Sequence, residues 1–407
     1  MSAMRTRSRL TVWVCGLMFA APLVAQQPAT LALEPAVIPG SRVGDNSRAQ
    51  LLAYSAASQW AIRPRTLNDA WIANGLARYA ELLAVENQGG NVALQKALED
   101  VAAGAMVYDA TPLAKAQNPL SPEFQSMTRD KGAMIFHMLR WELGDKAFLA
   151  VLKNLQSQSA ENPVGVADLE KLAEAESGRS LTAFFAQWVD GIGAPQFTST
   201  HTIYRLGNHR GFRTEGEIHQ NIDGFRMPIE LSIETDGKTE TQRIEITGRD
   251  THFVANTIGR PRQIRIDPEG WVLKITPGLR ARVAILKGEK LAALNDLNGA
   301  LAEFQKALEE NAQSALVNYR IGEVLFRLGS YPASMNAYRD ALDGDGDPGW
   351  TAVWSHIALG KIFDLTGQRD RAVNEFQQAV KTGDNAQGAV TEAQRYLQKP
   401  YKRSGND

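Results

Sequence analysis

Four polar residues near the beginning of the chain have the types and the spacing from which a chemical site could be built. Tyr54 and Ser58 are four residues apart, Ser55 follows Tyr54, and Asn74 comes later. In a helix Tyr54 and Ser58 would lie one turn apart on one face, where two side chains can reach one metal ion. A phenol, two hydroxyls and an amide are weak zinc ligands when neutral, and the histidines begin only at His137. We therefore expect that this segment binds no zinc.

The residues around these four positions form a specific pattern. The frame consists of Gln59, Trp60, Asn68, Asp69, Trp71, Gly75, Ala77 and Tyr79. In this frame the chain resembles the gluzincin aminopeptidases, the family of membrane alanyl aminopeptidases, in which two His and a later Glu bind zinc beside a general-base Glu. The resemblance implies that Tyr54 and Ser58 replace the two His, Ser55 the base and Asn74 the ligand Glu. It therefore implies a peptidase relative that has lost its zinc and carries no catalytic residues.

The resemblance continues over 127–152 and onward to Phe197, and it covers about 48–197. In the family a catalytic Tyr that stabilises the oxyanion stands two residues before a Lys-Gly pair, and that position here is Arg129. A guanidinium can also stabilise an oxyanion. Without a metal or a base nearby, we expect Arg129 to be a surface charge.

The first 25 residues have the form of a secretory signal peptide. Three arginines precede an apolar run from Leu10 to Val24 with a small-residue end at Leu23-Val24-Ala25, so we expect cleavage near Ala25. An uncleaved membrane anchor is the alternative, although the run from Leu10 to Val24 is shorter than the roughly 20 residues of a spanning helix. We predict a secreted or periplasmic protein that is not inserted in a membrane after cleavage.

Composition and charge exclude several classes of function. Cys15 is the single cysteine and lies in the signal segment, so the mature chain would have no disulfide, thiolate metal ligand or cysteine nucleophile. Cleavage removes three arginines and changes the formal net charge from -1 to -1 - 3 = -4. A charge this small predicts no nucleic-acid partner.

Periodicity divides the rest of the chain. Helical spacing over 48–60, 67–84 and 92–102 predicts a first helical domain. Beyond it the period changes to two, with alternating Ile229, Leu231 and Ile233 before a hairpin turn at Asp236-Gly237. The predicted parts are the signal peptide 1–25, an extended lead-in 26–47, a helical domain 48–197, a β-sandwich 198–276, a solenoid 277–400 and a tail 401–407.

An internal repeat of helical period follows residue 277. Three sets of residues recur at intervals of 34 and 38: Gly288, Gly322 and Gly360; Phe304, Tyr338 and Phe376; Ala307, Ala341 and Ala379. This period resembles three tetratricopeptide repeats. We therefore predict a multidomain, mainly α protein, with a helical peptidase-like domain, a small antiparallel β-sandwich and a C-terminal α-solenoid of these repeats.

The four additional residues of the second interval fall in an acidic loop, 343–349. A calcium loop also has alternating acidic residues, as this loop has at Asp343, Asp345 and Asp347. Such a loop needs Gly at its sixth position and Glu at its twelfth, and these positions here are Pro348 and Trp354. A turn between helices is the interpretation that we adopt.

The concave face of the solenoid is the predicted binding surface. Its groove positions, inferred from the resemblance, are Tyr319, Glu323, Arg327, Trp354, Lys361 and Asp364. Two large aromatic side chains with charges of both signs suit an extended peptide or a partner's tail. The alternative is that Tyr319 and Trp354 pack against the β-domain or a neighbouring helix.

Two classes of function remain open from the sequence. The first is a catalytically inactive aminopeptidase homologue that binds a protein or peptide partner through its repeats and needs no cofactor. The second is a zinc aminopeptidase with a displaced active site, or one completed by a partner chain.

Overall fold

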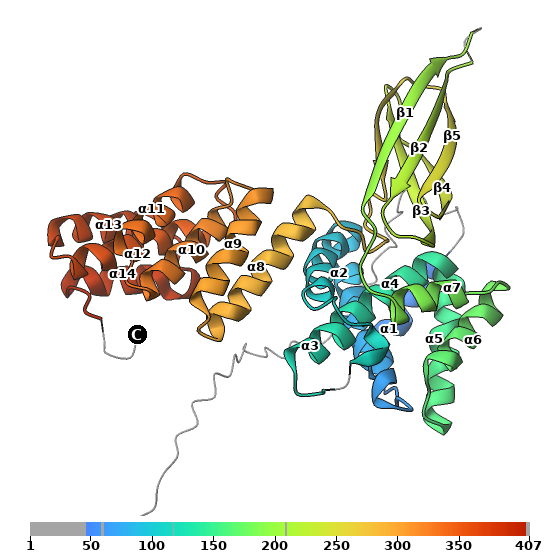
Figure 1. The fold of residues 1–407 in the computed structure, drawn as a ribbon, viewed down its shortest axis with the longest axis horizontal. Coiled ribbons are helices and arrows are strands. Elements are labelled where there is room, and N and C mark those ends of the chain that lie inside the picture. The colour runs from blue at the N-terminus through green and yellow to red at the C-terminus, as the bar shows by residue number, and fades with distance from the viewer. Residues whose placement is uncertain (1–45, 58–60, 117, 208–209, 404–407) are drawn as a thin grey trace, which may run out of the picture. The chain divides into compact units, whose positions relative to one another are not determined.

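A computed structural model of the protein describes residues 46–57, 61–116, 118–207 and 210–403. The predicted signal peptide and all but the end of the lead-in lie outside these residues. The described fold is mainly α, with a small antiparallel β part and a C-terminal series of helical repeats (Figure 1), which confirms the predicted fold class. In this part of the chain no helix is both long and apolar enough to cross a membrane.

The first domain is helical. Its helices are α1 Ser47–Ala57, α2 Ala70–Met106, α3 Pro122–Gln125, α4 Gly132–Leu143, α5 Asp145–Glu161, α6 Val166–Ser177 and α7 Thr182–Phe185. Short 3-10 turns at η1 Leu67–Asp69 and η2 Leu113–Lys115, and π-helical turns at η3 Ser126–Lys131 and η4 Ala186–Asp190, connect them. Their apolar faces form one core, in which Trp71, Phe136 and Phe148 are fully buried.

Helix α2 bends sharply at Gly90, whose φ is 68°. That left-handed conformation favours glycine because a Cβ atom would strain the backbone. Gly75, before the bend, lies against Gly132, and Gly104, after the bend, lies against the Asp130 side chain. The two arms of α2 therefore lie beside the same short segment, and they correspond to the two helices expected over 67–84 and 92–102.

The β part contains β1 Phe197–Arg205, β2 Phe212–Gln220, β3 Arg226–Thr235, β4 Glu240–Thr247, β5 Asp250–Thr257 and β6 Pro261–Ile266. The strands pair antiparallel in two sheets of three, in the orders β1-β2-β5 and β4-β3-β6. Ile229, Leu231 and Ile233 of β3 are buried, as their alternation predicts. The predicted hairpin turn joins β3 to β4.

The C-terminal helices follow one another as antiparallel pairs. The pairs are α8 Pro277–Ala293 with α9 Leu297–Glu310, α10 Ala315–Arg327 with α11 Tyr331–Leu342, and α12 Trp350–Leu365 with α13 Arg369–Thr382. A 3-10 turn, η5 Ala386–Gly388, leads to the last helix, α14 Ala389–Gln398. Helix α8 begins with Thr276, whose hydroxyl accepts the Leu279 N–H, and with Pro277 in its first turn.

A glycine and an aromatic ring form the same contact in each pair. A Cβ atom on Gly288 would lie 2.5 Å from the Phe304 ring, one on Gly322 2.7 Å from the Tyr338 ring, and one on Gly360 2.4 Å from the Phe376 ring. The recurring glycine allows the first helix to approach the aromatic residue of the second. This contact explains the spacing seen in the sequence.

Candidate functional site

The residues that the sequence resemblance assigns to zinc-ligand positions make structural contacts with different elements. The Tyr54 hydroxyl on α1 donates a hydrogen bond to the side-chain oxygen of Gln156 on α5. Asn74 on α2 donates its Nδ2–H to the Thr128 hydroxyl of η3 at 3.0 Å. Ser55 is buried, and Ser58 lies outside the described residues.

Arg129, at the position of the catalytic Tyr, pairs with a carboxylate on α2. Its guanidinium lies 2.9 Å from the Glu81 carboxylate, and both side chains are about half exposed. No group of three His, Cys, Asp or Glu that could hold a metal ion occurs among the residues that the structure describes.

The framing residues are held in position by packing and by hydrogen bonds. Gly75 and Gly132 meet at the crossing of α2 and α4, where a Cβ atom on Gly75 would lie 2.5 Å from the Gly132 carbonyl carbon. Trp71 and Tyr79, one turn to either side of Gly75, are fully buried. The Asp69 carboxylate accepts the Thr66 and Val166 N–H groups, at 3.0 Å each. This part of the frame therefore stabilises the domain by packing and by hydrogen bonds.

A buried charge network lies beside this crossing, and the sequence analysis did not find it. The Arg140 guanidinium binds both Glu86 oxygens, at 2.6 and 3.1 Å, and the Asp145 carboxylate at 2.6 Å. Arg140 and Glu86 side chains are 1% exposed, and Arg48 of α1 also pairs with Glu86. In the sequence, the sign of this network is that Glu86 and Arg140 are charged residues at helical positions where the spacing predicts apolar ones. A bidentate pair so deeply buried fixes the arrangement of α1, α2 and α4.

His137 adjoins this network in a stack of rings. Its ring lies 4.8 Å from that of Trp271 at 9°, and Trp271 in turn stacks on Trp141 at 5.2 Å. Burial lowers the pKa of His137 to about 3, and the positive charge of Arg140 adds to the effect. The imidazole is therefore neutral at physiological pH and packs as a ring.

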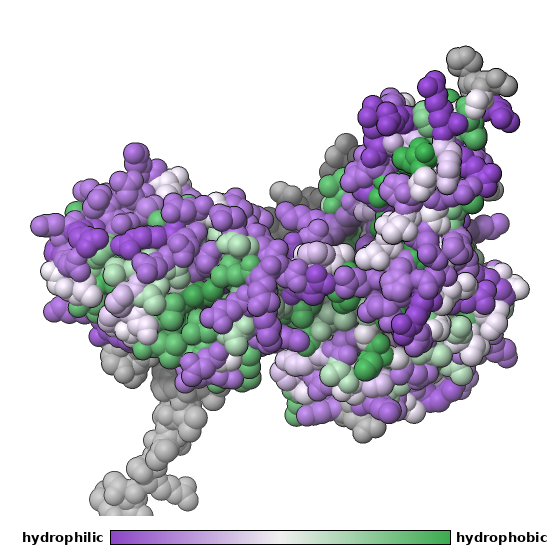
Figure 2. Space-filling model, turned by 45° about the horizontal axis from the view of Figure 1, so that its top comes forward, coloured by the Kyte–Doolittle hydropathy of each residue, from purple (hydrophilic) through white to green (hydrophobic). Residues whose placement is uncertain are grey.

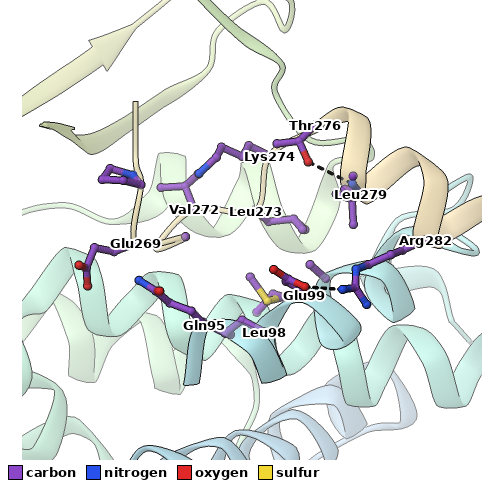
Figure 3. A pocket seen from close by; sticks show the side chains of 15 residues that line it. Gln95, Leu98, Glu99, Glu269, Val272, Leu273, Lys274, Thr276, Leu279 and Arg282 are labelled. Carbon is purple, nitrogen blue, oxygen red and sulfur yellow. Dashed lines mark hydrogen bonds and ion pairs between the residues drawn. The ribbon is translucent and has the colours of Figure 1, made fainter. Parts of the chain in front are cut away.

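A pocket of about 460 Å³ lies between α2, the segment after β6 and the start of α8. Figure 3 shows Gln95 and Glu269 at one end and the ion pair between Arg282 and Glu99 at the other. Lys274 in its wall binds the buried Asp267 carboxylate at 2.6 Å. Glu99, Lys274 and Arg282 are thus ion-paired, whereas Glu269 accepts a hydrogen bond from the Asn91 amide, and the remaining lining is largely apolar.

Of the predicted groove residues of the second repeat, Tyr319 and Arg327 contact neighbouring helices, and Glu323 pairs with Arg320 of its own helix. The Tyr319 ring lies 5.5 Å from Tyr338 and 5.2 Å from Trp350, and the residue is 7% exposed. Glu323 accepts a hydrogen bond from Arg320 at 2.7 Å. Arg327 donates to the Ala292 carbonyl at 2.9 Å, so its guanidinium joins the first repeat to the second.

The predicted groove residues of the third repeat contact the chain after α13. The Trp354 indole N–H donates to the Ala386 carbonyl at 3.2 Å. Lys361 pairs with Glu392 of α14 at 2.7 Å. The Asp364 carboxylate accepts the backbone N–H of Tyr401 at 2.7 Å. Residues of the stretch 386–401 therefore occupy this part of the predicted groove.

Between the first and second repeats an ion cluster connects first helices. Arg320 of α10 binds Glu289 of α8 at 2.9 Å as well as Glu323, and its guanidinium lies 5.6 Å from the Trp350 ring centre. Figure 2 shows apolar surface gathered on the repeats. Trp350, at the beginning of α12, is partly buried against the apolar core of the second and third repeats. This surface combines charges of both signs with an aromatic ring.

The acidic loop between the second and third repeats is used as a turn. Asp345 accepts the Ala315 N–H at 3.0 Å and a hydrogen bond from Asn311 at 3.1 Å. These bonds fasten the loop to the beginning of α10, in agreement with the interpretation of the loop as a turn.

The chain has distant likenesses to solved structures. No protein-family model and no curated protein matches the chain. The structure of Legionella pneumophila aminopeptidase A in complex with aspartic acid is similar with a TM-score of 0.45 and 11% identity, over 81% of this chain and 49% of that one. The structure of MamA is similar with a TM-score of 0.23 and 17% identity, over 29% of this chain and 75% of that one. The chain thus spans about half the length of the aminopeptidase structure, and neither likeness is evidence of a shared activity.

Proposed function

We propose that this protein is a catalytically inactive relative of the aminopeptidases that binds a protein or peptide partner through its helical repeats. The observation that supports this function is the use of Tyr54, Asn74 and Arg129 in contacts with Gln156, Thr128 and Glu81. Catalysis by this family's chemistry needs a bound metal to activate water and a base to deprotonate it. In this proposal the protein needs no cofactor. Its first segment resembles a signal peptide, which favours a secreted or periplasmic location.

The partner surface that we propose is the face of the first two repeats around Arg320. The groove positions of the third repeat already contact α14 and the chain around it. The face between α8 and α10 has Glu289, Arg320 and Glu323 beside the partly exposed Trp350. Aromatic side chains provide anchors for a bound chain, and charges of both signs determine its direction.

The inactive state is tested by metal content and turnover. We expect the purified mature protein to contain less than stoichiometric zinc and to hydrolyse no aminoacyl anilide. Any residual turnover should be the same in the Asn74→Ala variant, because in the proposed protein the Asn74 amide bonds to the Thr128 hydroxyl and holds no metal. One zinc per chain with chelator-sensitive turnover would instead establish the zinc aminopeptidase with a displaced or partner-completed site.

The binding surface is tested by capture from an envelope extract. We expect Arg320→Ala to reduce capture of the main partner, whereas Arg339→Ala should not. Arg339 is a matched control because it lies on the second helix of the same repeat and bonds only weakly, to Asn336 at 3.3 Å. Unchanged capture by both variants, with unchanged unfolding midpoints, would exclude the face around Arg320.

A further inference from the structure

The chain returns over its own repeats after α14. Beyond Gln398 the backbone becomes extended at Lys399, and residues 399–403, here called the returning segment, contact α10, α11, α12 and α14. The N–H of Tyr401 donates to Asp364 at 2.7 Å. The Asp364 side chain is 1% exposed and also pairs with Arg369 at 3.0 Å. A backbone donor of the returning segment thus meets a carboxylate that is held in a fixed position.

Tyr401 lies among side chains from three helices. Its ring centre is 5.5 Å from that of Tyr396 in an edge-to-face arrangement and 6.5 Å from that of Phe326. The ammonium of Lys361 lies 5.4 Å from the Tyr401 ring centre. Edge-to-face and cation–π contacts of this kind recognise an aromatic ring by its geometry.

Arg403 is recognised by a second set of groups. Its guanidinium lies 5.7 Å from the Phe326 ring centre. It also donates to the Tyr331 hydroxyl and to the Arg327 carbonyl, at 3.3 Å each. Residues two apart in an extended chain have their side chains on one side, so Tyr401 and Arg403 can both contact the ring of Phe326.

We infer that the surface formed by Phe326, Tyr331, Lys361 and Asp364 is a docking site for an extended peptide that has a Tyr and, two residues later, an Arg. The returning segment occupies this site until such a partner displaces it. The inference rests on the proposed function, because it names the class of peptide that the repeats bind at this surface. It adds a second surface, distinct from the face around Arg320.

The covalent connection of the returning segment gives it an advantage over any free peptide. A short tether maintains an effective concentration on the order of millimolar, against which a free peptide must compete. Weakening the returning segment should therefore increase the apparent affinity of a free peptide, although the site itself is unchanged.

The test uses the full chain with Tyr401→Ala and Arg403→Ala combined, beside the unaltered chain. The probe is a fluorescein-labelled synthetic peptide with the sequence of residues 399–407, and binding is followed by fluorescence anisotropy. We expect the double variant to bind the probe at least about tenfold more tightly than the unaltered chain. A probe with alanine at the positions of Tyr401 and Arg403 should bind neither protein.

A third substitution locates the binding. In the double variant, Phe326→Ala should abolish probe binding, whereas Leu328→Ala should leave it unchanged, because Leu328 is 42% exposed near the same helix end. Equal affinity of the double variant and the unaltered chain would overturn the inference. So would the absence of binding by a double variant with an unaltered unfolding midpoint, or a concentration-dependent dimer of the unaltered chain that the double variant does not form. Zinc content and turnover are measured separately, so failure here is distinguishable from failure of the proposed function.

Discussion

At the scale of single residues, the two charge pairs of Arg140 and Arg129 differ chiefly in burial. Arg140 and Glu86 are withdrawn from water on both sides, whereas Arg129 and Glu81 are about half exposed. Removing one member of a buried pair leaves an uncompensated charge in an apolar surrounding, whereas water solvates the remaining member of an exposed pair.

We expect Arg140→Met to lower the free energy of unfolding by about 3 kcal/mol, because Glu86 loses its bidentate partner and keeps only the salt bridge to Arg48. Arg129→Met, the matched control, should change it by less than about 1 kcal/mol. Urea titrations of the two variants and the unaltered protein measure both values. Similar losses in the two variants would show that burial does not decide the strength of these pairs.

His137 predicts a pH dependence with a definite sign. Its pKa falls from an ordinary value of 6.5 to about 3 in the fold because the ring is buried and near Arg140. Below pH 6.5 the unfolded chain binds a proton that the folded chain excludes. The stability that the neutral ring contributes is complete above pH 6.5 and falls by about 1.4 kcal/mol per pH unit toward pH 3.

The measurement is the free energy of unfolding of the unaltered protein and of His137→Gln between pH 7 and pH 4. We expect the difference between them to shrink as the pH falls, because the variant has no imidazole to protonate. His201→Gln, on the exposed strand β1, is the control and should follow the unaltered protein. A difference that stays constant over this range would contradict the buried neutral imidazole.

At the scale of the elements, the helical pairs depend on the glycine beneath each aromatic ring. Gly360→Ala would bring a methyl group to 2.4 Å from the Phe376 ring, and Phe376 is fully buried. We expect a loss of about 1–3 kcal/mol from overpacking. Thermal unfolding followed by circular dichroism measures this loss.

Gly278→Ala is the control for this substitution. Gly278 is also in the first helix of a repeat, but a Cβ atom there would meet only the Thr276 hydroxyl oxygen, at 4.0 Å. Alanine favours a helix over glycine by up to about 1 kcal/mol, so this variant should be as stable as the unaltered protein or slightly more so. A loss as large as that of Gly360→Ala would mean that the ring contact is not the cause.

At the scale of the whole molecule, the segment between β6 and α8 joins the parts by apolar packing. Trp271 of this segment stacks between His137 and Trp141 of the first domain. Arg282 of α8 makes an ionic contact with the same domain, at 2.8 Å from Asp100, and these two side chains are 43% and 74% exposed.

We expect Trp271→Ala to lower the free energy of unfolding by about 3 kcal/mol, because a large ring leaves a cavity between two aromatic neighbours. Arg282→Ala should cost less than about 1 kcal/mol, since exposed ion pairs contribute little. Chemical unfolding of both variants tests the order. The reverse order would show that the ionic contact is what holds α8 to the first domain.

The amino-acid sequence by itself determined the features that repeat along the chain or alternate within one element. The spacing of Gly288, Gly322 and Gly360 predicted the helical pairs because each glycine contacts an aromatic ring within its own pair. The alternation in β3 predicted its buried face for the same local reason. The frame around Gly75 was visible in the sequence because close crossing of two helices restricts residue types.

Only the tertiary structure decided which side chains that are distant in the sequence contact one another. Glu86 and Arg140 are 54 residues apart in the chain, so no period links them. Lys361 and Asp364 occupy groove positions in the sequence pattern, but α14 and Tyr401 contact them in the structure. A sequence pattern gives the face on which a side chain lies, whereas the folding of distant segments determines what covers that face.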